Sequence, residues 1–143
     1  MHRLYDINTL GPLRMVEVML PLLEKSALKR LCFVSSEAGS VSASTRTSWF
    51  GYCSSKAALN MIVKNLFNRL RPEGYTFRLY HPGRMRTYMS GTKNHNADME
   101  PEEAAVYALR YFLGEDLTNP MAPSSWDEDR LVLRDWQGKV WPF

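Results

Sequence analysis

Short apolar runs alternate along this chain with longer segments whose apolar residues recur at helical spacing. The expected order is a helix over residues 6–25, a strand over 31–34, a helix over 51–70, a strand over 75–80, a helix over 101–112 and a strand over 131–133. Strands that are separated by helices are joined by right-handed crossovers and lie parallel. The sequence therefore predicts an α/β fold, with a parallel sheet of about three strands flanked by helices.

The pattern also predicts how some of these elements are buried. The first helix is expected to begin at Asp6, a good N-cap residue. Its apolar residues form two rows, which indicates that the helix is covered on two sides. The run Leu31–Val34 has no polar alternation, which is typical of a strand buried on both faces. The Ser- and Thr-rich segment over residues 36–48 is expected to lie outside the core.

The composition is that of a soluble globular domain, with 45% apolar and 23% charged residues. The net charge of +3 is too small and too scattered to indicate nucleic-acid binding. The sequence has neither a signal peptide nor the roughly 20 consecutive apolar residues that span a membrane. Its three histidines, His2, His81 and His95, lack the spacing of metal ligands. A cytoplasmic enzyme without a metal site is the expectation.

Tyr52 and Lys56 lie four residues apart on an expected helix, so their side chains project from one face. A free tyrosine has a pKa of about 10 and is a weak base at neutral pH. A neighbouring ammonium group lowers the pKa of the phenol, which can then exchange protons near pH 7. A lone pair of this kind also arises by chance, so its surroundings must decide.

Ser36 provides such surroundings, because it follows the carboxyl end of the expected strand over 31–34. Ligands bind at the carboxyl ends of strands in open α/β sheets. A hydroxyl at this position can hydrogen-bond a substrate carbonyl and polarise it. Ser42 and Ser44, by contrast, are interpreted as ordinary loop residues.

Four motifs follow one another in a fixed order. They are Asn8 in the first helix, Val34-Ser35-Ser36-x-Ala38-Gly39, Tyr52-x-x-x-Lys56 and Pro82-Gly83-x-x-x-Thr87. This order is similar to that of the short-chain dehydrogenase/reductase family. The resemblance covers roughly residues 4–113 and implies part of a Rossmann-like, doubly wound parallel sheet. The interval between Ser36 and Tyr52 is longer than is usual in the family, so the intervening loop is expected to bulge.

The resemblance implies hydride transfer between NAD(P)(H) and a carbonyl or alcohol carbon of a small molecule. Tyr52 would be the general acid in reduction and the base in oxidation. Lys56 would lower the pKa of Tyr52 and hydrogen-bond the nicotinamide ribose. Ser36 would hold the substrate oxygen, and Asn8 would position a water that links Lys56 to solvent.

The resemblance also implies which residues face the cofactor. The backbone of Pro82 and Gly83 would face the nicotinamide, and Thr87 would hydrogen-bond its carboxamide. The family's glycine-rich turn, which holds the pyrophosphate at a helix N-terminus, has no counterpart in this sequence. The chain is therefore expected to be the C-terminal catalytic portion of a truncated member, and it does not distinguish NAD from NADP.

Two functions remain open at this point. One is an NAD(P)-dependent oxidoreductase; the other is a non-catalytic remnant or dimerisation module that binds no dinucleotide. The helices over 6–25 and 51–70 correspond to those that pack between subunits of family dimers, so a homo-oligomer is expected. The strand over 31–34 would lack its usual partner along one edge.

Overall fold

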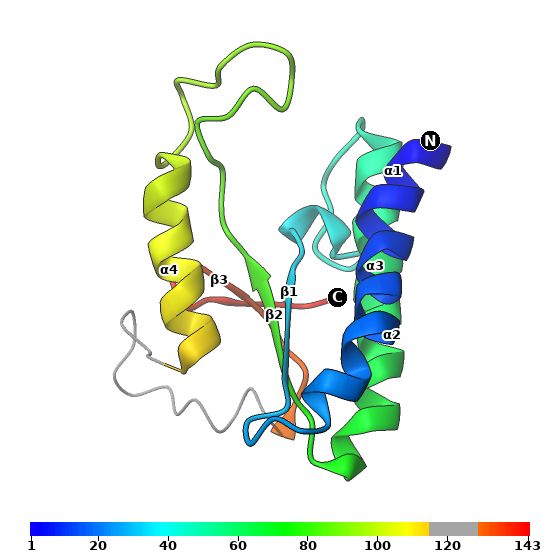
Figure 1. Ribbon diagram of the computed structural model, residues 1–143. Helices are drawn as coiled ribbons and strands as arrows, with labels where there is room; N and C mark the ends of the chain where they lie inside the picture. Colours follow the sequence, from blue (N-terminus) through cyan, green and yellow to red (C-terminus); the bar gives the residue numbers. More distant parts are fainter. Residues whose placement is uncertain (115–128) are drawn as a thin grey trace.

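Figure 1 shows the chain as a computed structural model, in which residues 1–114 and 129–143 are described. The helical elements are α1 (His2–Tyr5), the π-helical turn η1 (Asp6–Leu10), α2 (Gly11–Leu23), the 3-10 turn η2 (Glu37–Gly39), α3 (Phe50–Leu70), the 3-10 turn η3 (Arg71–Glu73) and α4 (Pro101–Leu113). The strands are β1 (Arg30–Val34), β2 (Thr76–His81), β3 (Leu133–Asp135) and β4 (Val140–Trp141). The predicted alternation of helices and strands is confirmed.

The strands form one sheet in the order β1-β2-β3-β4. β1 pairs with β2 and β2 with β3 in parallel, as the helical connections predicted, whereas β4 returns antiparallel beside β3. Val34 lies opposite Tyr80, and the backbone N–H of Ser35 donates to the carbonyl of Tyr80 at 2.7 Å. The carboxyl ends of β1 and β2 therefore meet at one edge of the sheet.

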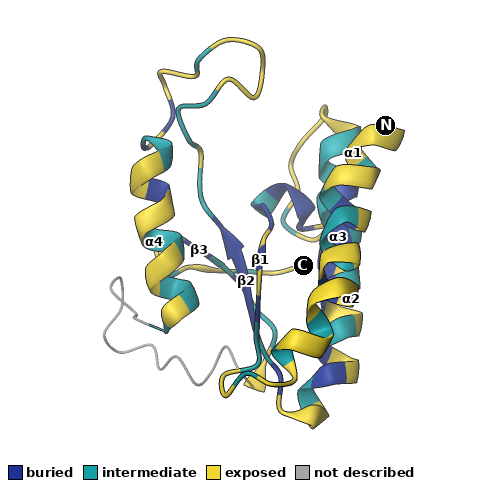
Figure 2. Cartoon of the chain, in the orientation of Figure 1, coloured by how far each residue is buried: buried dark blue, intermediate teal, exposed yellow. Residues whose placement is uncertain are grey.

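Helices cover both faces of the sheet, with α2 and α3 on one side and α4 on the other (Figure 1). Successive residues of β2 point to opposite faces, as in any strand. Phe77 and Leu79 belong to the core cluster shared with α2 and α3. Tyr80 instead lies against the rings of Tyr111 and Phe112 on α4. β2 is consequently buried on both faces and forms the centre of the molecule (Figure 2).

The apolar stripe predicted on the long helix packs against this sheet. Its buried residues are Leu59, Val63, Phe67 and Leu70. They contact Leu31 and Phe33 of β1 within the same core cluster. This packing fixes α3 along the sheet and so sets the position of Tyr52 near its first turn.

The first helix differs from the expectation in its start and in its burial. The helical run begins at His2, and Asp6 has helical backbone angles, so it is not an N-cap. Its carboxylate instead accepts a hydrogen bond from Arg14 at 2.7 Å. Only one of the two apolar rows is covered: Val16 is buried, whereas Met15 and Leu22 are about three-fifths exposed, at 60% and 61%. The second row faces outward because the sheet lies on one side of α2 only.

β1 is buried on one face and not on both. Leu31 and Phe33 are buried, whereas Cys32 and Val34 are exposed on the opposite face. The reason is the position of β1 at the end of the strand order, where no described helix covers that second face (Figure 2). Within the described residues β1 has no partner along its outer edge.

The C-terminal strand lies two residues later than predicted and continues into a hairpin. β3 spans Leu133–Asp135 where 131–133 was expected, and the antiparallel β4 was not predicted at all. The carboxylate of Asp135 accepts the backbone N–H groups of Gln137 and Lys139, both at 2.9 Å. Gly138 supplies the positive φ, 82°, that a tight hairpin loop requires.

Part of the segment over 36–48 belongs to the interior, contrary to the expectation. Ser36, Ala38, Gly39 and Ser40 are all buried. Gly39 lies so close to α3 that an added Cβ would be 2.7 Å from the carbonyl carbon of Lys56. The polar composition is accommodated because the Ser35 hydroxyl donates to Asn60 Oδ1 at 2.6 Å and Asn60 Nδ2 donates to the Gly39 carbonyl at 3.1 Å.

Candidate active site

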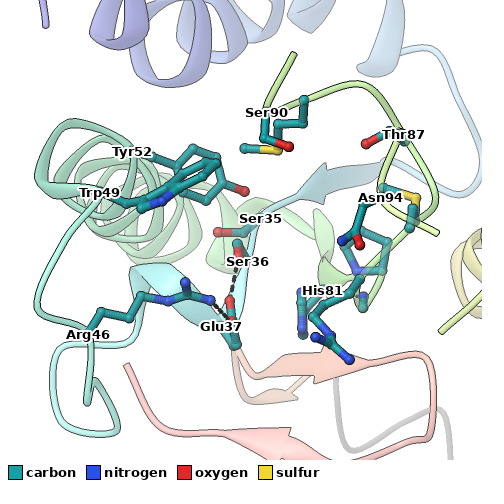
Figure 3. A pocket seen from close by; sticks show the side chains of 15 residues that line it. Ser35, Ser36, Glu37, Arg46, Trp49, Tyr52, His81, Thr87, Ser90 and Asn94 are labelled. Atoms are coloured by element: carbon teal, nitrogen blue, oxygen red, sulfur yellow. Dashed lines mark hydrogen bonds and ion pairs between the residues drawn. The ribbon is translucent and has the colours of Figure 1, made fainter. Parts of the chain in front are cut away.

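A cavity of about 270 Å³ opens where β1 and β2 end (Figure 3). Of the residues predicted from the sequence, those that line it are Ser36, Tyr52, Pro82, Gly83 and Thr87. The remaining lining residues are Ser35, Glu37, Arg46, Trp49, His81, Arg84, Met85, Met89, Ser90 and Asn94. The cavity thus collects residues from three segments of the chain, 35–37, 46–52 and 81–94.

Ser36 is held in the cavity wall by two hydrogen bonds. It is the extended residue before η2, and its Oγ accepts from the backbone N–H of Ala38 at 3.1 Å, as an N-cap serine does. The same hydroxyl donates to Oε2 of Glu37 at 2.7 Å. The end of β1 and the start of η2 therefore fix both the place and the orientation of this hydroxyl.

Tyr52 points toward Ser36 from the first turn of α3 (Figure 3). Trp49, the residue before the helix, has a positive φ of 63°, which is uncommon for a non-glycine residue. Its indole ring contacts the ring of Tyr52 edge-on, with centroids 6.0 Å apart. Burial raises the pKa of Tyr52, and the charges of Glu37 and Cys53 act in the same direction, whereas Ser36 and Arg46 lower it. The phenol accordingly keeps its proton at neutral pH.

Lys56 does not line the cavity, although it lies one helical turn from Tyr52. Its Nζ donates to the carbonyl of Val34 at 3.1 Å, and burial lowers its pKa. The expectation from the sequence was that this ammonium lowers the pKa of Tyr52. In the structure burial dominates at the phenol and raises the pKa of Tyr52, while the Lys56 ammonium donates to the Val34 carbonyl at the end of β1.

Asn8 also lies behind the cavity wall and not in it. It belongs to the π-helical turn η1, an irregularity that often marks functional sites. Its Nδ2 donates to Oγ of Ser55 at 3.1 Å, and that hydroxyl donates to the carbonyl of Tyr52 at 2.8 Å. The neighbouring Thr9 is buried and donates to the Ser55 carbonyl at 2.8 Å. Asn8 and Thr9 therefore dock η1 onto α3 directly behind Tyr52.

One side of the cavity is formed by the segment that follows β2, which includes Pro82, Gly83 and Thr87. Gly83 has a φ of 82°, and an added Cβ would lie 2.5 Å from the indole Nε1 of Trp136, so a side chain is excluded there. The backbone of Thr87 donates to the Met85 carbonyl at 2.8 Å and accepts from Asn94 at 3.0 Å. These bonds fold the segment after β2 back over the cavity.

Comparison with known proteins identifies this arrangement. The family model described as short chain dehydrogenase matches residues 1–98, more than half of the chain. The chain belongs to the short-chain dehydrogenase family. The matched range includes all four motifs, from Asn8 to Thr87.

Curated relatives of the chain include bacterial and yeast proteins. The C-signal protein of Myxococcus xanthus is 47% identical over 91 residues, which is 64% of this chain and 55% of that protein. An uncharacterized oxidoreductase of Saccharomyces cerevisiae is 37% identical over 126 residues, covering 78% of this chain and 49% of the relative. The chain thus spans about half the length of these relatives.

Solved structures agree on the fold. The NADPH-bound carbonyl reductase from chicken fatty liver superposes with a TM-score of 0.76 at 27% sequence identity. The match covers 97% of this chain and 55% of the reductase. The Rossmann-like fold class predicted from the sequence is therefore confirmed for this chain.

Sequence reasoning missed several residues of the site. Glu37 and Arg46 pair across the cavity wall, with Nη2 of Arg46 bonded to Oε1 of Glu37. Glu37 could have been noticed because it directly follows Ser36, and Trp49 because it directly precedes the helix of Tyr52. Arg46 carries no local signal, since only the folded loop brings it back to Glu37.

The described part of the chain contains no group of three His, Cys, Asp or Glu side chains that could hold a metal ion. None of the helices in that part is long and apolar enough to span a bilayer.

Proposed function

We propose that this chain supplies the catalytic half of an NAD(P)(H)-dependent oxidoreductase that interconverts small carbonyl compounds and alcohols. One observation carries the proposal: Ser36, Tyr52 and Thr87, predicted separately from three motifs, line a single cavity at the carboxyl ends of β1 and β2. That edge is where open α/β sheets bind their ligands. The similarity to an NADPH-bound carbonyl reductase supports the same chemistry.

In carbonyl reduction, Tyr52 donates its phenolic proton to the substrate oxygen as general acid. Because its pKa is raised, the phenol is protonated at neutral pH and so has a proton to donate. Ser36 holds the substrate oxygen beside Tyr52, and the N-cap bond to Ala38 keeps it in place. Asn8 positions the backbone of Tyr52 through Ser55. Lys56, one helical turn from Tyr52 on α3, has its Nζ held by the Val34 carbonyl at the end of β1.

The cavity fits the nicotinamide end of NAD(P)(H). Thr87 and the backbone of Pro82 and Gly83 lie in the same cavity as Tyr52, and a hydroxyl can both donate to and accept from a neutral carboxamide. Thr87 would hold that carboxamide, and Lys56 would bind the nicotinamide ribose. The bound nicotinamide would supply or accept the hydride. The residues present do not select between NAD and NADP.

A homo-oligomer in which α2 and α3 pack against a second copy remains part of the proposal. The uncovered row on α2 supports it, since Met15 and Leu22 are 60% and 61% exposed. On α3, Met61 is 62% exposed as well. Exposed apolar side chains that gather on neighbouring helices are typical of protein interfaces.

We predict that the 143-residue chain alone does not bind NADPH at micromolar concentrations in titration calorimetry. The physical reason is that its sequence lacks the glycine-rich turn that holds the pyrophosphate. A chimera that places the nucleotide-binding half of the chicken carbonyl reductase ahead of residue 1 is expected to bind NADPH and to oxidise it when a carbonyl substrate is added. Micromolar binding by the chain alone, or a folded chimera that binds NADPH without turnover, would contradict the proposal.

A further inference from the structure

The Ser36 hydroxyl already makes two hydrogen bonds within the protein before any substrate binds. A serine hydroxyl has one hydrogen to donate and two lone pairs to accept. In this chain the hydrogen goes to Oε2 of Glu37 at 2.7 Å (Figure 3). One lone pair accepts the backbone N–H of Ala38 at 3.1 Å. What remains toward the cavity is a single lone pair, so Ser36 faces the cavity as a hydrogen-bond acceptor.

Glu37 is held in an ionised, accept-only state by its surroundings. Its second oxygen, Oε1, is bonded to Arg46, which returns from the long loop between η2 and α3. Burial would raise the pKa of Glu37, but the hydrogen bonds from Ser36 and Arg46 outweigh it, and the charges of His81 and Arg46 act in the same direction. The net result is a pKa below the usual value. At neutral pH the carboxylate can therefore only accept the Ser36 hydrogen.

We propose that Glu37, anchored by Arg46, is a positioning residue for Ser36, which it turns from a hydrogen donor into a hydrogen acceptor toward the cavity. The effect of Glu37 on the Ser36 hydroxyl does not depend on the proposed function; only its consequence for substrate binding rests on that function. An alcohol substrate can donate its O–H to Ser36 as the hydroxyl stands. A carbonyl substrate has no hydrogen to give, so Ser36 must first release Glu37 before it can donate to that oxygen.

The hydrogen bonds that join Ser36, Glu37 and Arg46 also bear on the pKa of Tyr52. Its phenolate would compete with the Glu37 carboxylate for the one hydrogen of Ser36. Burial is the largest influence on the pKa of Tyr52 and raises it, and a hydrogen bond with Ser36 lowers it. Among the nearby charges, Glu37 raises this pKa and Arg46 lowers it. Cys53 also raises the pKa of Tyr52, but it is not a member of the Glu37–Arg46 ion pair. The two members of the pair should thus have opposite effects on one phenol.

The test is a pH titration of the 143-residue chain, labelled with 13C at the ζ carbon of tyrosine and followed by NMR. The Tyr52→Phe variant assigns the Tyr52 signal. Glu37→Gln is expected to move the Tyr52 titration to lower pH, because its amide can donate to Ser36 and so releases the serine hydrogen to the phenolate. Arg46→Gln is expected to move it to higher pH. Glu24→Gln, an exposed change at the end of α2, is the matched control and should leave it in place.

A loop that merely loosens would shift the Tyr52 titration in the same direction in both variants, and that result would overturn the proposal, as would no shift in Glu37→Gln. The carboxyl of Glu37, labelled at its δ carbon, gives an independent measurement that needs neither variant. Ser36→Ala should raise the pKa of Glu37, and an unchanged value would show that Ser36 does not donate to it. Neither measurement requires cofactor or turnover, so either outcome is separate from success or failure of the proposed oxidoreductase activity.

Discussion

Tyr52→Phe, made in the NADPH-binding chimera, is expected to lower kcat for carbonyl reduction by about 10²–10⁴-fold. Phenylalanine preserves the ring, and with it the edge-on contact to Trp49 at 6.0 Å. It removes only the hydroxyl that lies beside Ser36 and gives the proton to the substrate oxygen. The loss should fall on kcat with little change in KM, because the proton is transferred in the transition state. Steady-state kinetics with NADPH absorbance as the signal measures both constants.

Tyr5→Phe is the matched control for this change. Tyr5 lies on α1 and does not line the cavity, so removal of its hydroxyl should leave kcat within about twofold of the parent. If Tyr52→Phe turned over as fast as the parent, or if both variants lost activity equally, Tyr52 would not be the general acid.

Gly39→Ala is expected to lower the free energy of unfolding of the chain by about 1–3 kcal/mol, the usual range for overpacking. An added Cβ would lie 2.7 Å from the carbonyl carbon and 2.8 Å from the carbonyl oxygen of Lys56, and 2.9 Å from Nδ2 of Asn60. Backbone atoms within α3 cannot move aside as a flexible side chain can, which places the loss toward the upper end. Because Gly39 ends η2, relief of the clash also moves Ser36 away from Tyr52. Urea denaturation measures the free energy.

Gly11→Ala provides the comparison within the same chain. Gly11 starts α2 with a helical φ of −55°, and its nearest neighbour would be 3.4 Å from an added Cβ. Alanine is the better helix former, so a gain of up to about 1 kcal/mol is expected. Equal losses in the two variants would mean that the close approach of Gly39 to α3 is not what the fold depends on.

The parts of the fold that the sequence predicts are those with a strong local pattern. The stripe from Leu59 to Leu70 predicts α3 almost to the residue, and helices between strands predict a parallel sheet. β4 could not be predicted, because a two-residue strand has no periodicity of its own. It exists because Asp135 holds the hairpin loop and accepts the indole N–H of Trp141 at 2.8 Å.

The residues of the site likewise divide into those that a local motif predicts and those that it does not. Ser36, Tyr52 and Thr87 could be placed in one cavity from their motifs, because parallel strands bring their carboxyl ends to one edge. The contact of Lys56 with the Val34 carbonyl and the pairing of Arg46 with Glu37 depend on how a loop and a helix close on the sheet. Such tertiary contacts leave no periodic trace in the sequence, and they decide the electrostatics around Tyr52.

We propose that this chain carries the proton-donating and substrate-holding half of a hydride-transfer site. The most direct test uses the chimera with NADPH that carries deuterium at the reactive C4 position, a carbonyl substrate, and mass spectrometry of the product. We predict one deuterium on the alcohol carbon, formed at a rate that depends on Tyr52. An alcohol product without deuterium, or deuterium transfer that is unchanged in Tyr52→Phe, would contradict the claim.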